Sequence, residues 1–238
     1  MSEGQRRTRP HSAPLESHSN AMAKPQPVES KRAVPRLYLV TPLIGETSDF
    51  MAVLIGALEA ADVAAVLLRL APDSERTLIN RIKTLAAAVQ PKGAALLLDG
   101  QAGLTARSGA DGAHLTGVET FVTEVETLKP ERIAGCGGLQ TRHDAMLAAE
   151  RGADYVMFGE PDGSGRRPSF EAVIERIEWW AEVFEIPCVG FAASADEAAT
   201  LARAGADFVA LGGAIWDRGA AAAITEAAAC LDEREVTP

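Results

Sequence analysis

Short apolar runs alternate with longer amphipathic segments along most of this chain. In the longer segments, apolar residues return every three or four positions, which is the period of an α-helix. The short runs are almost continuously apolar, as expected for β-strands that are covered on both faces. The predicted strands are residues 37–41, 64–70, 94–98, 112–115, 132–135, 155–159, 187–190 and 208–211. The predicted helices are residues 49–60, 74–89, 103–108, 119–128, 141–151, 170–183, 194–204 and 214–232.

A three-residue motif, Gly-Ala-Asp, stands at three of the transitions from helix to strand. The copies are Gly109-Ala110-Asp111, Gly152-Ala153-Asp154 and Gly205-Ala206-Asp207. Each follows an alanine-rich segment, so its glycine falls at a helix C-terminus, where a left-handed backbone is needed. A repeated order of helix, tight turn and strand predicts parallel strands joined by helical crossovers.

Eight such units in a chain of 238 residues predict an α/β fold, namely a single (β/α)8 TIM barrel over residues 36–232. The competing fold is an open doubly wound sheet, which usually has a glycine-rich first turn. Here the first turn reads Thr41-Pro42-Leu43, which favours the barrel. In this fold the chemistry is expected at the carboxyl ends of the strands.

The two ends of the chain differ in composition from the predicted barrel. Residues 1–35 are rich in Arg, Lys, Ser and Pro without a hydrophobic period, which predicts a disordered basic tail. An organelle transit peptide and a true start at Met22 are alternative interpretations of this segment, whereas a signal peptide would need an apolar run. Residues 233–238 are predicted to form a loose C-terminal tail.

Charge and cysteine content narrow the class of protein. The net charge is −10 and no basic stripe falls within the predicted barrel, which argues against a nucleic-acid surface. No apolar run approaches the ~20 residues that span a bilayer, so no membrane partner is expected. Three cysteines without pair or metal spacing favour a cytoplasmic protein. The alanine-rich outer helices leave a homo-oligomer open.

Four segments of the chain resemble the thiamine phosphate synthase family and its relatives, the thiazole tautomerases. They are LYLVTP from residue 37, GADGAHLTGVE from residue 109, IAGCGGLQTRHDAMLAAERGADYVMFGEP from residue 133 and IPCVGFAASADEAATLARAGADFVALGGAIW from residue 186. The resemblance spans residues 37–216. It implies a role in thiamine biosynthesis, in which hydroxymethylpyrimidine diphosphate is joined to hydroxyethylthiazole phosphate with loss of pyrophosphate and with the help of Mg²⁺.

The resemblance also implies roles for residues at the second, third and fourth strand ends. Of the family's Gln-x-Arg-x-Lys pattern, which grips the diphosphate, only Arg69 remains, because Ala71 replaces the lysine. After the third strand the family has an Asn-Asp pair whose aspartate binds the metal. Here Asp99 stands at the position of the asparagine, one residue earlier, and Glu119 after the fourth strand replaces a second metal-binding aspartate. Arg69 is thereby assigned to catalysis, and Asp99 and Glu119 are assigned to Mg²⁺.

The remaining assignments concern the later strands. Arg166 stands near the position of a basic residue in the loop after the sixth strand, and is assigned to catalysis with Arg69. The family has two consecutive glycines after the seventh strand. Here the first is retained as Gly190, and Phe191 replaces the second. Gly212 and Gly213 precede the last predicted helix, where backbone N–H groups can hold a phosphate. The family's serine after the fifth strand is Gly137 here.

Because several family positions are substituted, other functions stay open. One alternative is a non-catalytic protein that senses or carries a phosphorylated thiamine precursor on the same barrel. Another is a different reaction that uses His114 or Cys136, although a core histidine and an inert buried thiol are the simpler interpretations. Asp99 and Glu119 could equally cap helices, and Arg69 could pair with a neighbouring acid.

Overall fold

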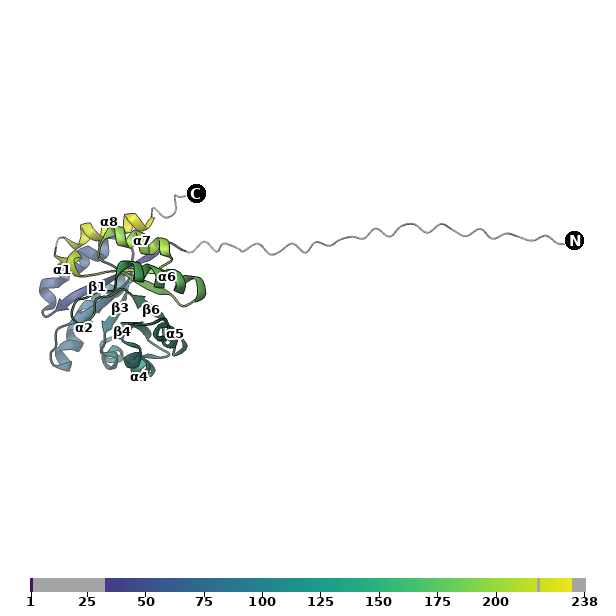
Figure 1. The fold of residues 1–238 in the computed structure, drawn as a ribbon. Coiled ribbons are helices and arrows are strands. Elements are labelled where there is room, and N and C mark those ends of the chain that lie inside the picture. Colours follow the sequence, from purple (N-terminus) through teal and green to yellow (C-terminus); the bar gives the residue numbers. More distant parts are fainter. Residues whose placement is uncertain (2–32, 218, 233–238) are drawn as a thin grey trace. The chain divides into compact units, whose positions relative to one another are not determined.

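The computed structural model describes residues 1, 33–217 and 219–232 (Figure 1). The tail predicted at residues 1–35 therefore falls almost wholly outside the described residues, as does the one at 233–238. Within the described part, Ala33, Val34 and Pro35 precede the first strand without regular structure. No helix in the described ranges is long and apolar enough to cross a membrane.

Eight parallel strands close into one barrel in sequence order, with β1 hydrogen-bonded to β8. The predicted TIM barrel is thus confirmed. Helices surround the strands, as Figure 1 shows. The strands are β1 (Arg36–Ile44), β2 (Val63–Leu70), β3 (Ala95–Asp99), β4 (Gly112–Thr116), β5 (Ile133–Gly137), β6 (Tyr155–Phe158), β7 (Cys188–Ala192) and β8 (Phe208–Leu211).

The helices agree with the predicted ones except in the third and eighth units. The α-helices are α1 (Thr47–Ala60), α2 (Glu75–Val89), α3 (Thr105–Ser108), α4 (Val118–Leu128), α5 (Arg142–Glu150), α6 (Phe170–Val183), α7 (Ala195–Ala204) and α8 (Ala220–Asp232). Three short 3-10 helices add η1 (Gln90–Lys92), η2 (Ala102–Leu104) and η3 (Gly213–Trp216). The third unit thus has a 3-10 turn before a four-residue helix.

The prediction of one helix over residues 214–232 is wrong, because the eighth unit contains η3 and α8 as separate elements. Gly219 has a left-handed φ of 85° directly before α8, a conformation that an α-helix cannot contain. The indole N–H of Trp216 donates to the carbonyl of Val40 on β1 at 2.8 Å. The short helix η3 is thereby attached to the barrel wall, and the phosphate site predicted at residues 212–213 opens a 3-10 turn rather than a long helix.

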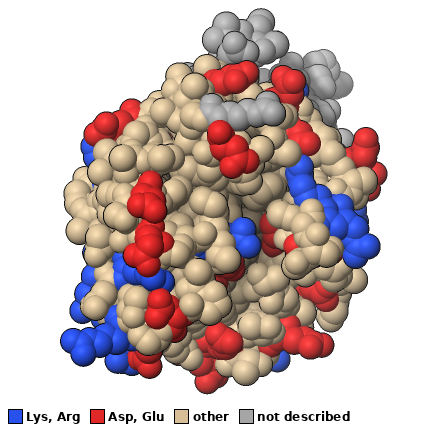
Figure 2. Space-filling view, turned by 90° about the vertical axis from the view of Figure 1, so that its left-hand side faces the viewer, with Lys and Arg blue, Asp and Glu red and all other residues tan. Residues whose placement is uncertain are grey.

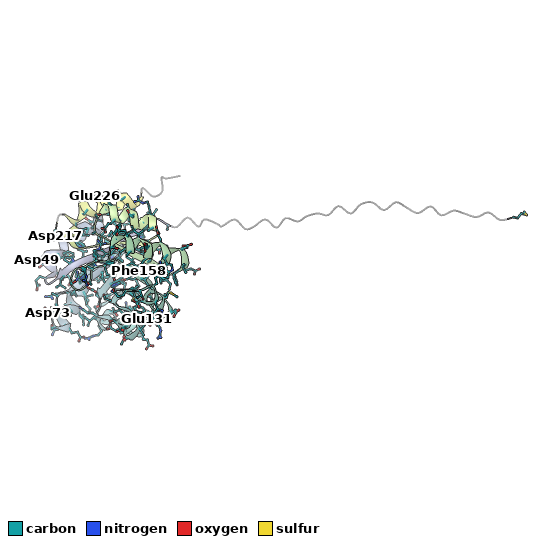
Figure 3. The ribbon with its side chains drawn as sticks, in the orientation of Figure 1. Asp49, Asp73, Glu131, Phe158, Asp217 and Glu226 are labelled. Carbon is teal, nitrogen blue, oxygen red and sulfur yellow. The ribbon has the colours of Figure 1, made fainter. Side chains whose placement is uncertain are left out.

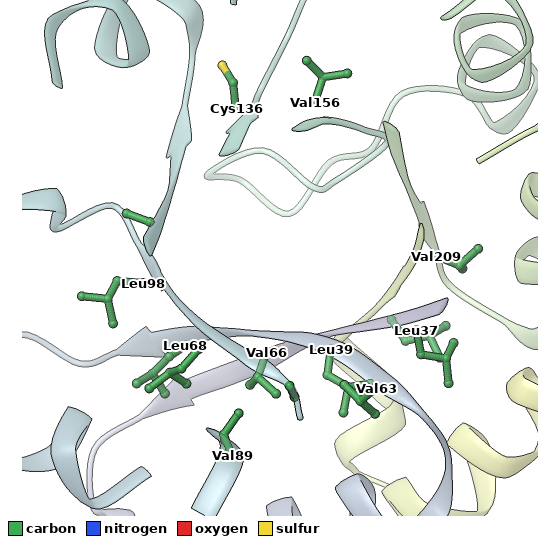
Figure 4. Packing of buried hydrophobic residues seen from close by; sticks show 14 of the residues in the cluster. Leu37, Leu39, Val63, Val66, Leu68, Val89, Leu98, Cys136, Val156 and Val209 are labelled. Carbon is green, nitrogen blue, oxygen red and sulfur yellow. The ribbon is translucent and has the colours of Figure 1, made fainter. Parts of the chain in front are cut away.

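Apolar side chains fill two separate layers. The larger layer lies between strands and helices; Figure 4 shows its packing around Leu39, Val66, Leu68 and Val89. The smaller layer fills the barrel interior and includes Tyr38, Leu67, Leu97, Tyr155, Met157 and Phe191. Since side chains alternate between the two faces of a strand, each strand contributes every second residue to the interior.

The three Gly-Ala-Asp motifs lie at the opposite end of the strands from the predicted active site. Their glycines have left-handed φ angles of 79°, 95° and 105°, as the repeat predicted. Each aspartate accepts the backbone N–H of a residue on the preceding strand. The bonds join Asp111 to Leu96 at 2.7 Å, Asp154 to Ala134 at 2.7 Å and Asp207 to Cys188 at 2.8 Å. The motif therefore ties β4 to β3, β6 to β5 and β8 to β7.

An aspartate also precedes β2, but without the motif's glycine, and it joins the strands through an exposed side-chain ion pair instead of a backbone N–H. Here the sequence reads Ala60-Ala61-Asp62, and Ala61 is extended, with φ at −160°. Asp62 accepts two hydrogen bonds from the guanidinium of Arg36, the first residue of β1, both at 2.8 Å. All four even-numbered strands are thus joined through an aspartate to the strand before them.

Candidate functional site

The carboxyl ends of the strands, which lead into the helices, form one face of the barrel, called here the mouth. Figure 3 labels Asp49, Asp73 and Asp217, which follow β1, β2 and β8, along one side of the molecule, and Glu131, which precedes β5, away from that side. Figure 2 shows the molecule from the side on which those three aspartates lie. Acidic groups are spread over this face, and the larger basic groups lie toward its edges.

Arg69 and Asp99 meet at the mouth, on neighbouring strands. Arg69 continues the inward-facing row of β2 after Ala65 and Leu67, and Asp99 continues the row of β3 after Leu97. The Arg69 Nε lies 3.2 Å from the Asp99 carboxylate, and the two side chains are 45% and 35% exposed. The backbone N–H of Arg69 also donates to the buried Thr41 hydroxyl at 3.0 Å. The structure thus brings these two predicted residues together and leaves both reachable from solvent.

Glu119 lies in the first turn of α4, where its side chain is exposed. Among the described residues no group of three or more His, Cys, Asp or Glu side chains is arranged to hold a metal ion. Mg²⁺ commonly takes only one or two carboxylates and completes its shell with water and substrate phosphate. Asp99 and Glu119 carry the hard carboxylate oxygens that Mg²⁺ prefers, and their assignment to the ion stays a prediction.

The three predicted phosphate-binding glycines have different surroundings. Gly190 lies inside β7, two residues before its end, and a Cβ there would lie 3.0 Å from Leu201 of α7. A Cβ on Gly212 would lie 3.0 Å from Val40. Gly213 has a left-handed φ of 64° and open space around it. Close packing therefore accounts for Gly190 and Gly212, and only Gly213 offers room beside its backbone.

Arg166 and Arg167 lie in the β6–α6 loop but point to different partners. The Arg166 side chain is 83% exposed and pairs with Asp162 at 3.3 Å within the same loop. Arg167 donates to the carbonyls of Gly159 and Phe191 and to the Glu197 carboxylate, at 3.1, 2.8 and 3.0 Å. Arg167 thus joins the loop to β7 and α7, while Arg166 remains available to solvent.

His114 belongs to a chain of buried polar groups inside the barrel. Its Nδ1 lies 3.0 Å from the Tyr155 hydroxyl, which lies 2.9 Å from the Tyr38 hydroxyl. Burial lowers the pKa of His114 to about 4, an effect that the charge of Asp99 partly opposes. His114 is therefore a neutral core histidine at neutral pH, in line with the simpler interpretation of its sequence context.

Cys136 faces away from the mouth. It is fully buried in the layer between strands and helices, as Figure 4 shows. Burial, together with the smaller effects of the Glu160 and Asp144 charges, raises the pKa of its thiol to about 12. A thiol that stays protonated at neutral pH is a poor nucleophile, so Cys136 is structural.

Glu160 directly follows the sixth predicted strand and so falls at the end where chemistry is expected, but no role was assigned to it from the sequence. It follows β6 by two positions and reaches back over β5, where its Oε1 accepts the backbone N–H of Gly138. The same oxygen lies 3.9 Å from Nε2 of His114, and the Glu160 side chain is only 17% exposed. A Cβ on Gly137 would lie 2.0 Å from Oε1 of Glu160 and 2.5 Å from Nε2 of His114. Glycine at position 137 is thus what gives the Glu160 carboxyl its place.

The Glu160 carboxyl is charged only in part at neutral pH. Burial raises its pKa from the ordinary value of 4.5 to about 7; the N–H groups of Glu160 and Gly138 oppose the rise, and the charge of Asp99 adds to it. Among the described residues, no lysine or arginine forms an ion pair with Glu160. Its carboxyl lines a cavity of about 350 Å³ at the mouth, together with Thr116, Gly138 and Arg176. A carboxyl poised to gain or lose a proton beside a cavity is typical of a functional site.

Comparison with known proteins agrees with this geometry. The profile of the family described as thiamine monophosphate synthase matches residues 37–215. The thiamine-phosphate synthase of Rhodospirillum centenum is 38% identical over 197 residues, which cover 80% of this chain and 95% of that protein. The thiamine-phosphate synthase of Hyphomonas neptunium is 37% identical over 199 residues, which cover 79% of this chain and 90% of that one.

Among solved structures, the thiamine phosphate pyrophosphorylase of Pyrococcus furiosus superimposes with a TM-score of 0.69. It is 22% identical to this chain, and the match covers 83% of this chain and 96% of that one. This likeness supports the fold. The family profile and the two relatives, each matching most of the barrel, show that the chain belongs to the thiamine monophosphate synthase family.

Proposed function

We propose that this protein acts in thiamine biosynthesis as a thiamine-phosphate synthase, which joins hydroxymethylpyrimidine diphosphate to hydroxyethylthiazole phosphate and releases pyrophosphate. The observation that carries the proposal is the pairing of Arg69 with Asp99 at adjacent strand ends in the mouth of a barrel of this family. An inward-facing cation beside a carboxylate suits a diphosphate that brings a metal ion with it.

In this reaction the Arg69 guanidinium binds oxygens of the diphosphate. Its present partner, Asp99, is held by a single contact at 3.2 Å between two partly exposed side chains. Such pairs contribute little to stability, about 0–1 kcal/mol, so a diphosphate can replace the carboxylate at small cost. The exchange leaves Asp99 to face the metal, and it places the cation where negative charge develops on the leaving group.

Mg²⁺ would be held by Asp99 and Glu119, and when bound it supplies positive charge that neutralises the departing pyrophosphate. The Arg69 guanidinium limits the repulsion between Asp99 and an incoming diphosphate. Thr41 accepts the Arg69 backbone N–H and thereby fixes the end of β2 from which the guanidinium projects.

The phosphate of the thiazole substrate is proposed to lie beside Gly213. Its left-handed backbone and open surroundings allow an anion to approach the peptide groups at the start of η3. Gly190 and Gly212 support this region by close packing, and Arg166 can reach an anion because its side chain is exposed. We also propose that the protein is cytoplasmic, because its three cysteines lack the spacing of disulfide pairs or metal sites. Its proposed partners are these small phosphorylated precursors.

A second candidate function is a non-catalytic protein that senses or carries one precursor. The observation in its favour is that Arg69 is the one retained member of the diphosphate pattern, with Leu67 buried in the core and Ala71 in place of the lysine. This function needs one phosphate pocket and no turnover.

Calorimetric titration followed by a turnover assay separates the two functions. The protein is titrated with hydroxymethylpyrimidine diphosphate and with hydroxyethylthiazole phosphate, each with and without Mg²⁺. The synthase is expected to bind the diphosphate more tightly with Mg²⁺ and to form thiamine phosphate when both substrates are present. Binding of one precursor without product would support the carrier, and absence of binding by either would overturn both.

A further inference from the structure

The position of Glu160 has a consequence for which substrate ring the cavity accepts. The inference rests on the proposed function. Two acidic groups at the mouth, Asp99 and Glu160, differ in their partners. Asp99 is paired with Arg69 and is partly exposed. Glu160 is mostly buried and, among the described residues, forms no ion pair with a lysine or arginine, although the charge of Arg176 acts on it. Removing a carboxylate from water without a cation is costly, so such an arrangement indicates a ligand or a proton that satisfies it.

The surrounding backbone holds the Glu160 carboxyl in place. The Gly138 N–H binds Oε1, and Gly137 leaves the space that this oxygen fills, since any side chain there would collide with it. Gly138 has a left-handed φ of 63°, a conformation that other residues adopt only at a cost. The carboxyl is therefore fixed over the end of β5 rather than free to leave the cavity.

We propose that Glu160 binds the aminopyrimidine ring of the diphosphate substrate and selects it against the thiazole. That ring carries an exocyclic amine beside a ring nitrogen, which together present a hydrogen-bond donor next to an acceptor. A carboxyl group that shares one proton with the ring offers the complementary acceptor and donor. The thiazole lacks such an edge, because it has no exocyclic amine.

The rest of the cavity is suited to a flat ring with an attached anion. Gly137 and Gly138 leave bare backbone beside the carboxyl, and Met157 and Leu139 give apolar contact at the same cavity. Arg69 and Asp99 lie across the mouth at the ends of β2 and β3. A ring held by Glu160 can thus direct its diphosphate toward Arg69.

Because the complex holds one proton between carboxyl and ring, pH should affect ring binding. The groups that face Glu160 or act on it are Tyr38, Asp99, His114, Cys136, Tyr155 and Arg176. Burial keeps the pKa of His114 at about 4 and that of Cys136 at about 12, and it raises the pKa of both tyrosines. Glu160 has a pKa of about 7. It is therefore the group expected to govern ring binding around neutral pH.

The test compares two ligands that share the diphosphate and differ in the ring. Wild type, Glu160→Ala and Glu160→Gln are titrated with hydroxymethylpyrimidine diphosphate and with inorganic pyrophosphate, in Mg²⁺. Glu160→Ala is expected to weaken binding of the pyrimidine diphosphate by roughly ten- to a hundred-fold and to leave pyrophosphate binding unchanged. Glu160→Gln keeps an acceptor and a donor, so its affinity should stay within about threefold of wild type near neutrality.

The pH dependence of binding and a second variant provide two further tests of the Glu160 proposal. Wild-type affinity for the pyrimidine diphosphate should fall as pH rises above about 7, while that of Glu160→Gln should stay flat. Gly137→Ala, whose Cβ must displace the carboxyl, should show the same ring-specific loss as Glu160→Ala. Thermal unfolding of each variant establishes that it is folded.

Equal loss of both ligands in Glu160→Ala would show a structural role and overturn the proposal, as would no loss of either. Wild-type protein that binds pyrophosphate but not the pyrimidine diphosphate would overturn the ring site alone. Wild-type protein that binds neither would overturn the proposed synthase, and the ring assignment with it.

Discussion

Carboxylates lie at both ends of this barrel, and the two ends treat them differently. At the floor, where the strands begin, Asp111, Asp154 and Asp207 each accept a backbone N–H from the neighbouring strand. At the mouth, Glu160 is buried beside His114 and has a pKa of about 7. The floor carboxylates are satisfied by bonds that the fold itself requires, whereas the mouth carboxylate retains unused bonding capacity beside a cavity. The comparison separates groups that hold the barrel together from groups that are available to a ligand.

The largest expected effect tests the mouth alone. Arg69→Ala should lower kcat/KM for thiamine phosphate formation by roughly a hundred- to a thousand-fold, because it removes the cation that meets the leaving diphosphate. Its stability should change by no more than about 0.5 kcal/mol, since the pair with Asp99 is partly exposed. Steady-state kinetics and urea unfolding measure the two effects. Arg69→Lys, which keeps the charge, should recover part of the activity, and a large loss of stability in Arg69→Ala would assign Arg69 to the fold instead.

The second effect is the contribution of the buried Glu160 carboxyl to the pH dependence of the free energy of unfolding. The folded protein holds the Glu160 proton up to about pH 7, whereas an unfolded chain releases it near 4.5. Glu160 therefore lowers stability as pH rises through this window, and Glu160→Gln should exceed wild type by about 2–3 kcal/mol above pH 7 and match it below pH 4. His114, whose pKa is lowered, acts in the opposite direction, so its own contribution to stability rises between about pH 4 and 6.5.

Urea unfolding of wild type, Glu160→Gln, His114→Gln and the double variant across this pH range separates the two contributions, because the His114 ring lies 3.9 Å from the Glu160 carboxyl and the two groups affect each other. If the free energy of unfolding of wild type and of Glu160→Gln varied equally with pH, the Glu160 carboxyl at the mouth would not differ in protonation from the carboxylates at the floor.

The third effect tests the floor. Asp154→Ala should lower the free energy of unfolding by about 2 kcal/mol, because the buried N–H of Ala134 loses its acceptor. The kcat of the folded protein should not change. Asp154→Asn is the matched control: it retains an acceptor oxygen and removes only the charge that pairs with Lys129. An alanine variant as stable as wild type would show that the repeated motif does not hold the strands.

The smallest effect separates the two arginines of the β6–α6 loop. Arg166→Ala should change stability by less than about 0.5 kcal/mol, because among the described residues its side chain forms an ion pair only with Asp162, in the same exposed loop. Arg167→Ala should cost more, about 1–3 kcal/mol, since it removes donors from two carbonyls and from Glu197. Thermal unfolding of both variants measures the difference, and equal losses would mean that the loop does not depend on Arg167.

The sequence predicted those features that depend on neighbours along the chain. Apolar periodicity gave the strands and most helices, and the left-handed backbone at Gly109, Gly152 and Gly205 followed from their position after helical segments. The single eighth helix was predicted wrongly because the alanine-rich pattern continues through Gly219, whose φ interrupts it. Local patterns thus predict elements well and breaks between them less well.

Features that depend on distant neighbours could not be predicted. Nothing in the segment around Glu160 indicates that its side chain turns back over Gly137, which lies on another strand. The same holds for the partners of Asp111, Asp154 and Asp207, since the repeat showed the motif but not the strand that each aspartate contacts. The pairing of Arg69 with Asp99 could have been predicted from the sequence, because both residues lie at the ends of neighbouring strands and face inward.

The four aspartate links divide the barrel into four two-stranded modules: β1–β2, β3–β4, β5–β6 and β7–β8. A circular permutant whose new termini lie between β4 and β5, or between β6 and β7, keeps each of the four aspartate links within a covalently continuous module. New termini between β5 and β6 would instead divide one module between the two ends of the chain. The barrel should therefore tolerate rearrangement at module boundaries, and be assembled or split most readily in units of two strands.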